Sequence, residues 1–298
     1  MLRGDDALLG CRDRVNEIVT ERDERRTPEQ LRDHYEVERE LSDRLRRAPS
    51  KERRSLYGSV YDELFRRVPD HPQLTWKADA DERSRSVHQQ LRLLGRYLGP
   101  DSSFLEVGAG DCALACEVAR SARRVYAVDV SAEITRDLLA PVNLELILSD
   151  GCSIPVPPGG VDVAYSNQLM EHLHPEDARE QLRNIYAALA PGGAYVCITP
   201  NRLLGPADIS MYFDDVATGF HLKEYTNAEL ATLCRAAGFR RVQSIVWLKW
   251  FGLPLPSFVS AALEAMLERL PTRVVKKAGR TPLSRLLGIN MVAWKPTA

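Results

Sequence analysis

The sequence has no surplus of charge of either sign, because 41 aspartate and glutamate residues match its 40 lysine and arginine residues. The net charge of -1 gives the molecule no overall basic field of the kind that holds nucleic acid by its phosphates. We therefore expect no nucleic-acid partner. The 44% hydrophobic content over 298 residues excludes a disordered chain and fits one large domain or two modest ones.

Long apolar segments and cysteine motifs are also missing. The most apolar stretch, residues 250–263, has 14 residues and two prolines, so it is too short to cross a bilayer. The first residues contain no apolar core of a secretory signal. The six cysteines form neither a C-x-x-C pair nor a cluster with histidine at zinc spacing. These absences predict reduced thiols and a cytoplasmic protein.

Residues 1–78 predict a helical N-terminal extension. Charges of both signs alternate there, and the pairs Thr27-Pro28 and Pro49-Ser50 are typical of helix starts. Apolar residues recur at helical spacing: Leu31, Tyr35, Leu41, Leu45, Leu56, Val60, Leu64 and Phe65. We interpret the segment as a solvated cap on the main domain, with a substrate lid or a dimerisation arm as alternatives.

Residues 79–298 show a different sequence pattern, in which short apolar runs alternate with helical patterns. The runs are 104–108, 125–130, 144–150, 161–167, 194–200, 242–248 and 289–294, and the helical patterns are 79–98, 112–121, 131–139, 175–190 and 226–238. Such alternation predicts an α/β fold with a mostly parallel sheet covered by helices on both faces. The last two runs are separated by the segment 249–288, which we expect to be a helical insertion.

A glycine-rich loop follows the first of these runs. Gly108 and Gly110 let the backbone come close to a ligand at the carboxyl end of the strand. Asp129 ends the second run 19 residues beyond Gly110, where an acid accepts hydrogen bonds from ribose hydroxyls. The combination predicts a nucleotide-type cleft.

Two further features indicate which ligand this cleft takes. The third glycine of a dinucleotide fingerprint is missing, since Cys112 lies where the helix begins. Asp150 ends the third run, where it would accept a hydrogen bond from the adenine amino group and occupy the space that a dinucleotide needs for its second half. An adenosyl ligand with a short charged tail fits this pattern better.

Five ordered motifs then resemble one family. They are E-V-G-A-G-D, A-V-D-V-S, S-D-G-x-x-I-P, N-Q-L-M-E-H-L and L-A-P-G-G-A-Y-V-C-I-T-P-N, within about residues 80–240. They resemble class I S-adenosylmethionine-dependent methyltransferases, and within these the small-molecule group of the ubiquinone and menaquinone methyltransferases. The resemblance implies a Rossmann-like sheet of seven strands, mostly parallel with the last strand antiparallel, and S-adenosyl-L-methionine as cofactor. Residues 79–298 would form this methyltransferase domain.

The resemblance also implies roles for seven cofactor-binding residues: Glu106, Gly108, Gly110, Asp129, Asp150, Gly151 and Asn167. The first three would shape the pocket of the methionine moiety, and Asn167 would lie near its end. Asp129 would bind the ribose, while Asp150 and Gly151 would flank adenine. The structural alternatives are a helix N-cap for Asp129 and a turn for Asp150.

The quinone O-methyltransferases hold a divalent metal with a Glu-x-x-Glu-His run after the fourth strand. Here Gln168 takes the place of the first glutamate, and a neutral amide weakens a magnesium-type site. We therefore predict no required metal. As general base the sequence offers His221 and, second, His172, which is otherwise a packed residue that fixes its loop. Tyr225 would be a wall of the substrate pocket.

Other segments and functions stay open at this point. Residues 201–208 look like a substrate-facing loop, residues 209–219 are a lid or an ordinary insertion, and residues 249–288 form a cap, a peripheral membrane contact or a dimer interface. The expected function is methyl transfer to oxygen or nitrogen of a small-molecule acceptor, such as a natural product, a sugar or a lipid-linked precursor. The alternatives are a nucleic-acid or protein methyltransferase, or a cofactor-binding regulator without catalysis.

Overall fold

The computed structural model describes residues 26–74, 80–131, 139–248, 251–279, 281 and 284–297. Most of the helix predicted over 131–139, and the first residues of the predicted insertion at 249–250, lie outside this part of the chain.

A single eight-stranded sheet forms the centre of the molecule, in the order β3-β2-β1-β4-β5-β8-β6-β7. The strands are β1 (Ser103–Val107), β2 (Arg124–Asp129), β3 (Leu144–Leu148), β4 (Val161–Asn167), β5 (Leu189–Thr199), β6 (Arg241–Leu248), β7 (Phe251–Pro256) and β8 (Ile289–Trp294). Strands β1 to β5 pair in parallel, and β8 lies antiparallel between β5 and β6. The predicted Rossmann-like sheet with an antiparallel last strand is confirmed.

The predicted count of seven strands was wrong, because β7 adds an eighth. It pairs antiparallel with β6, with Ile245 opposite Pro254 and Gln243 opposite Pro256. We expected only helix in this part of the insertion. Proline has no N–H to give to a sheet, so two prolines in one strand are tolerated at the outer edge, where β7 lies.

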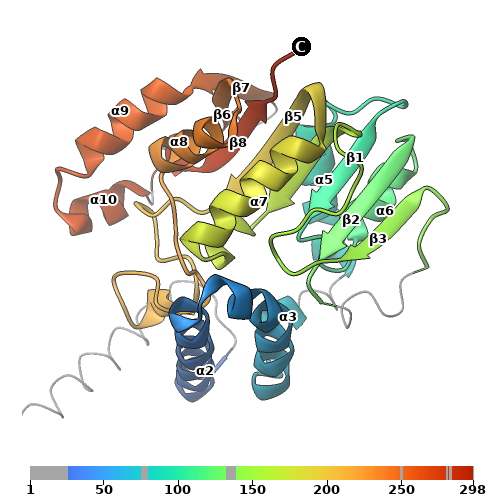
Figure 1. Cartoon of the computed structure of the whole chain (residues 1–298). Helices are drawn as coiled ribbons and strands as arrows, with labels where there is room; N and C mark the ends of the chain where they lie inside the picture. Colours follow the sequence, from blue (N-terminus) through green and yellow to red (C-terminus); the bar gives the residue numbers. More distant parts are fainter. Residues whose placement is uncertain are drawn as a thin grey trace, which may run out of the picture.

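Helices cover both faces of the sheet (Figure 1). Helices α5 (Ala80–Leu94) and α6 (Ala113–Ala119) lie on one face, and α7 (Pro175–Ala188) and α8 (Asn227–Ala237) lie on the other. The core divides accordingly: Phe104 packs with the side of α5 and α6, and its neighbour Leu105 packs with the side of α7 and α8. Apolar residues on both faces of β1 explain why its sequence shows no polar alternation.

The described part of the N-terminal extension, residues 26–74, contains the helices α2 (Pro28–Arg47) and α3 (Ser50–Arg67), which stand beside each other beyond the end of the sheet (Figure 1). Thr27 begins α2 with a full capping box to Gln30. Pro49 is the N-cap of α3 but makes no side-chain bond, so the second helix starts differently from the first.

A buried ion pair fixes α3 to the main domain. The Arg53 guanidinium donates to both carboxylate oxygens of Asp177 on α7, over 2.7 and 3.0 Å. Both side chains are buried, and Tyr57 also donates to Asp177 over 2.7 Å. The N-terminal helices are therefore part of the domain's packing and not a separate arm.

The insertion after β7 consists of α9 (Ser257–Leu267), α10 (Thr272–Gly279) and α11 (Ser284–Leu287). A small apolar cluster of Leu267, Val275 and Leu287 holds these helices together. Its helical content was predicted. No helix in the described part of the chain is long and apolar enough to cross a membrane.

Candidate active site at the carboxyl ends of strands β1 to β4

A cavity of about 420 Å³ lies where the parallel strands end. Its walls come from the segments after β1, β2, β3 and β4, together with α3 and α5. Seven of the nine residues that the sequence singled out line it: Glu106, Gly108, Gly110, Asp129, Gly151, Asn167 and His172. Asp150 and His221 are not among the lining residues.

The glycine loop and the acid after β2 hold each other in place. Gly110 N–H donates to Asp129 Oδ2 over 2.7 Å, and Ser131 N–H donates to Oδ1 over 3.0 Å. Gly110 has a φ of 55°, and a side chain there would point into open space. These two bonds fix the carboxylate of Asp129 at the wall of the cavity.

Glu106 presents a buried carboxylate to the same cavity. Its Oε2 atom has no hydrogen-bond partner among the described residues. Burial raises the pKa of this carboxyl well above its ordinary value. A buried acceptor without a partner at a cavity wall favours a ligand that brings a hydrogen-bond donor or a positive charge.

The turn after β3 departs from the expected arrangement. Asp150 Oδ1 accepts from Cys152 N and Ser153 N, over 2.9 and 2.7 Å, and Oδ2 pairs with Arg54 on α3 over 3.3 Å. Burial alone would raise the pKa of Asp150, but these hydrogen bonds and the guanidinium lower it. Its carboxylate thus closes its own turn, as in the structural alternative, and Gly151 faces the cavity instead.

Two residues other than glycine, in the turns after β1 and β4, adopt the left-handed backbone conformation. Cys112, at the N-cap of α6, has a φ of 57°, and Gln168, just after β4, has a φ of 53°. This region costs free energy for a side-chain-bearing residue. The cysteine in place of a third glycine is accommodated by strain, and Gln168 is a strained residue that lines the cavity.

Helix α3 contributes a wall of the cavity that was not predicted from the sequence. Tyr57, Tyr61 and Phe65 lie at intervals of four on this helix, and all three line the cavity. A side chain at Gly151 would meet the Tyr57 ring at 2.9 Å, so only glycine lets the helix come so close. The aromatic spacing was present in the sequence, but nothing there indicated where α3 would pack.

His172 and His221 lie side by side at the edge of the cavity, with ring centroids 4.9 Å apart. His172 Nδ1 donates to the Phe220 carbonyl over 3.2 Å, and His221 Nδ1 lies 2.7 Å from Glu224 Oε1. Glu171 lies beside them with a buried Oε1 that has no partner among the described residues. We call Glu171, His172 and His221 the cavity-side cluster.

Burial and charge act differently on these three groups. Burial, reinforced by the neighbouring His221, lowers the pKa of His172 to about 3, and burial raises the pKa of Glu171 to about 7. Burial also acts to lower the pKa of His221, but the bond to Glu224 and the charges of Glu171 and Asp208 outweigh it and raise the pKa. His172 is therefore neutral near pH 7, and His221 is the more basic ring.

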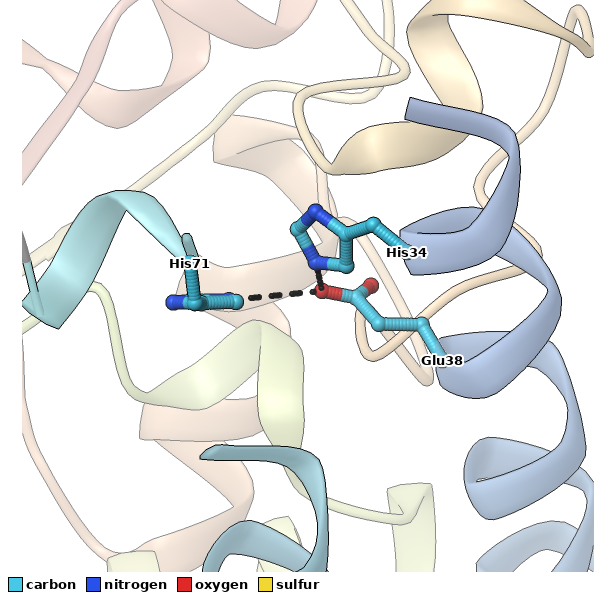
Figure 2. Close-up of side chains that lie close together, drawn as sticks. All are labelled: His34, Glu38 and His71. Carbon is cyan, nitrogen blue, oxygen red and sulfur yellow. Dashed lines mark hydrogen bonds and ion pairs between the residues drawn. The ribbon is translucent and has the colours of Figure 1, made fainter. Parts of the chain in front are cut away.

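A second buried group contains His34, Glu38 and His71, which we call the N-terminal cluster (Figure 2). His34 Nε2 lies 2.7 Å from Glu38 Oε1, and His71 Nε2 lies 3.7 Å from the same oxygen. The other ring nitrogens accept hydrogen bonds, His34 Nδ1 from Arg26 and His71 Nδ1 from Gln73 N–H. Both Nε2 atoms therefore carry a proton toward Glu38.

In each cluster three possible ligand atoms lie within 4.8 Å of one another, so distance alone does not separate the two as metal sites. The tautomers of the histidines do separate them. A metal needs a lone pair on the ring nitrogen. In the N-terminal cluster both Nε2 lone pairs are used by protons. In the cavity-side cluster both Nδ1 atoms carry a proton, so neutral His172 has a free Nε2 lone pair next to Glu171, and His221 has one when its ring is neutral. Of the two, only the cavity-side cluster has a donor set that suits a divalent ion.

The two clusters are connected through one residue. Phe220 N–H donates to Glu38 Oε2 over 3.0 Å, while the Phe220 carbonyl accepts from His172. The Phe220 ring also stacks on Tyr61 at 5.1 Å. Helix α2 therefore fixes the segment that orients the cavity histidine.

The loops after β5 pack away from the cavity. Asn201 donates to Glu264 on α9, Tyr225 is buried, and η2 (Ile209–Tyr212) packs on α2. None of these residues lines the cavity. A substrate-facing loop at 201–208 and a substrate wall at Tyr225 therefore find no support in this geometry.

Comparison with known proteins identifies the family of this chain. Residues 78–244, more than half of the chain, match the family model described as a methyltransferase domain. The chain belongs to this family, within the class I S-adenosylmethionine-dependent methyltransferases. S-adenosyl-L-methionine is the cofactor of this class.

The individual proteins that the chain resembles have low sequence identity to it. A protein of Mycolicibacterium smegmatis named "probable S-adenosylmethionine-dependent methyltransferase" is 32% identical over 149 residues, which is 50% of this chain and 55% of that protein. A Mycobacterium tuberculosis protein with the same description is 30% identical over 158 residues, 53% of this chain and 54% of that protein. The chain spans about half the length of the curated relatives it matches.

The fold also resembles solved structures. Phosphoethanolamine N-methyltransferase 1 of Haemonchus contortus, solved with phosphoethanolamine and S-adenosylhomocysteine, covers 84% of this chain with a TM-score of 0.54 and 14% identity, over 51% of its own length. At this identity the likeness concerns the fold alone.

The cavity residues fit the cofactor of the family. The unpartnered Oε2 of Glu106 suits a cationic amino group, and the open space beside Gly110 suits a ligand that lies against the backbone. Asp129 would hold the ribose, and Gly151 would face the adenine end.

Proposed function

We propose that this chain transfers the methyl group of S-adenosylmethionine to an oxygen or nitrogen atom of a small-molecule metabolite. One observation carries the proposal: the glycine loop with Asp129 and the aromatic wall with His172 line the same cavity. Its volume of about 420 Å³ is in the range of small-molecule sites, about 300–1,000 Å³. Natural products, sugars and lipid-linked precursors are the acceptor classes we consider.

The cofactor, when bound, supplies an electrophilic methyl group. The chain's contribution is first to position the acceptor, because a well-oriented pair of reactants at about 3–3.5 Å gains much of the rate. Tyr61 and Phe65 form an apolar wall on which the body of an acceptor packs. Neutral His172 accepts a hydrogen bond at Nε2 from the hydroxyl or amine to be methylated.

The second contribution is to receive the proton that the acceptor loses. In this proposal His221 is the base, because its pKa is raised and Glu224 holds its Nδ1–H. His221 lies behind His172 and outside the cavity lining, so its role depends on an acceptor that reaches past the His172 ring. His172 is the residue that contacts the acceptor.

Cofactor binding is the first test of the proposal. Isothermal titration calorimetry with S-adenosylmethionine and S-adenosylhomocysteine should give micromolar affinity for the wild type. Asp129→Ala should weaken it at least tenfold, about 1.4 kcal/mol. Asp101→Ala, in the exposed turn before β1, is the matched control and should bind as the wild type does. No binding by the wild type would overturn the proposal.

The acceptor class is tested by transfer of label from methyl-tritiated S-adenosylmethionine. Three pools from one cell extract serve as acceptors: molecules below 3 kDa, RNA and protein. We expect label in the low-mass pool with the wild type and none with Asp129→Ala. Label in RNA or protein would replace the small-molecule proposal, and binding without transfer to any pool would favour a non-catalytic regulator.

A further inference from the structure

Helix α9 has its polar side turned inward and its apolar side turned outward. The buried residues are Ser257, Ser260, Glu264 and Leu267, three of which are polar. Phe258 is 72% exposed and Met266 is 59% exposed. These two residues are eight positions apart and share one face of the helix. A helix on a water-soluble surface normally has the opposite arrangement.

Hydrogen bonds lock α9 in this orientation. Glu264 Oε1 accepts from Asn201 Nδ2, Asn227 N and Asn227 Nδ2, over 2.7, 2.7 and 2.9 Å. Its Oε2 accepts from Ala228 N over 3.0 Å, so this carboxylate caps α8. The helix cannot rotate to bury Phe258 without leaving Glu264 and the start of α8 unsatisfied.

The exposed apolar side chains gather around this helix. Of the eleven large apolar side chains that are exposed in the described part of the chain, seven lie between residues 253 and 286: Leu253, Phe258, Val259, Met266, Leu270, Val274 and Leu286. Strand β7 and helix α11 both contact α9. We call these seven residues the α9 surface. Exposed apolar side chains gathered on neighbouring elements in this way favour a binding surface.

The charges beside the α9 surface identify the kind of partner. Residues 257–288 contain six basic residues (Arg269, Arg273, Lys276, Lys277, Arg280 and Arg285) and two acidic residues (Glu264 and Glu268). Glu264 of α9 is buried against α8, Glu268 pairs with Arg202, and of the basic residues Lys276 pairs with Asp215. Among the described residues no acidic side chain pairs with Arg269, Arg273 or Arg285.

We propose that the α9 surface docks the protein on an anionic lipid surface. Phe258, Met266 and their neighbours would enter the boundary of headgroups and acyl chains, and the unpaired arginines would contact lipid phosphates. A second copy of the chain fits less well, because a symmetric pairing brings two basic surfaces together without acidic residues to match them. The surface is separate from the cavity at the ends of β1 to β4, so the inference does not depend on the proposed reaction.

Vesicle sedimentation tests this inference with the full chain. Vesicles of phosphatidylcholine with 30 mol% phosphatidylglycerol should carry the wild type into the pellet, and pure phosphatidylcholine vesicles should carry much less. F258S/M266S should lower the bound fraction at least fivefold. R269Q/R273Q should remove the preference for anionic vesicles, and added salt should weaken wild-type binding.

Val142→Ser is the matched control. Val142 is another fully exposed apolar residue, and it lies next to β3 at the opposite edge of the sheet. It should sediment as the wild type does, and unchanged cofactor affinity shows that each variant is folded. Equal binding by the wild type and F258S/M266S would overturn the proposal. So would a wild type that stays in the supernatant, including one that elutes as a dimer which F258S/M266S converts to a monomer.

Discussion

Two buried groups of histidine and glutamate in this molecule have similar composition and opposite hydrogen bonding. In the N-terminal cluster, both imidazoles point protonated Nε2 atoms at Glu38. In the cavity-side cluster, both imidazoles direct their protonated Nδ1 atoms at acceptors, one on Phe220 and one on Glu224. In the N-terminal cluster all four ring nitrogens face a partner within the protein. In the cavity-side cluster the two Nε2 atoms and Glu171 Oε1 make no hydrogen bond among the described residues.

The difference teaches that residue type does not separate structural from chemical histidines, whereas tautomer does. A tautomer is set by the group that faces the other ring nitrogen. Arg26 and Gln73 N–H face Nδ1 in the N-terminal cluster, while oxygen atoms face it in the cavity-side cluster. We therefore propose that the first cluster serves stability and the second serves the reaction.

The largest expected effect is the loss of stability when Glu38 of the N-terminal cluster is removed. Glu38→Ala leaves two imidazole N–H groups and Phe220 N–H without their acceptor inside the protein. Removal of one partner from a buried charged group costs about 3–5 kcal/mol. Urea unfolding should show a loss of this size, and kcat should fall as well, because Phe220 orients His172.

Two further variants make the Glu38 result interpretable. Glu36→Ala removes an exposed glutamate from the same helix and should change the free energy of unfolding by less than about 0.5 kcal/mol. Glu38→Gln keeps an oxygen acceptor and should lose less than Glu38→Ala, which gives a readable variant if the alanine protein does not fold. A loss below about 1 kcal/mol in Glu38→Ala would contradict the structural role.

At the cavity-side cluster the expected effect is on rate. A general base contributes about 10²–10⁴-fold, so His221→Ala should lower kcat at least 100-fold, about 2.7 kcal/mol, with little change in KM. His172→Ala should raise KM as well, because in the proposed function this residue contacts the acceptor. Steady-state kinetics with the acceptor found in the transfer assay separates the two effects.

His88→Ala is the control for both histidine variants, since His88 is exposed on α5. It should keep wild-type kinetics. If His221→Ala retained more than a third of the activity, catalysis would rest on positioning alone and His221 would be a packed residue.

The strand-end side of the cavity, where we propose that the cofactor binds, was predictable from the sequence. The glycine loop, Asp129 and Asn167 are read from short motifs, because each follows a strand whose end must lie at one edge of a parallel sheet. The same reasoning misplaced Asp150, since a motif gives a residue's position along the chain and not the hydrogen bonds that compete for its side chain. Ser153, Cys152 and Arg54 take those bonds.

The half that faces the acceptor was not predictable. Tyr57 and Glu38 act on residues more than 90 positions away, on Gly151 and on Phe220. Such contacts depend on how α2 and α3 dock, which no local pattern encodes. Strand β7 was missed for a related reason, because its two prolines disfavour a strand except at an edge that only the completed sheet defines.

The smallest predicted effect is a shift of the pH profile, which tests whether His221 is the base. The bond to Glu224 and the nearby acidic charges raise the pKa of His221 above its ordinary value, so the neutral base disappears as the pH falls through that raised pKa, and activity falls with it. Glu224→Gln keeps an oxygen for His221 Nδ1 and for Ala207 N–H but removes the negative charge. The pKa of His221 then falls, and the acidic limb of the kcat–pH profile should move to lower pH. Glu229→Gln, on the capping box of α8, should leave the limb in place. An acidic limb that does not move in Glu224→Gln would show that another group limits the rate at low pH, and the cavity-side cluster would then resemble the N-terminal one.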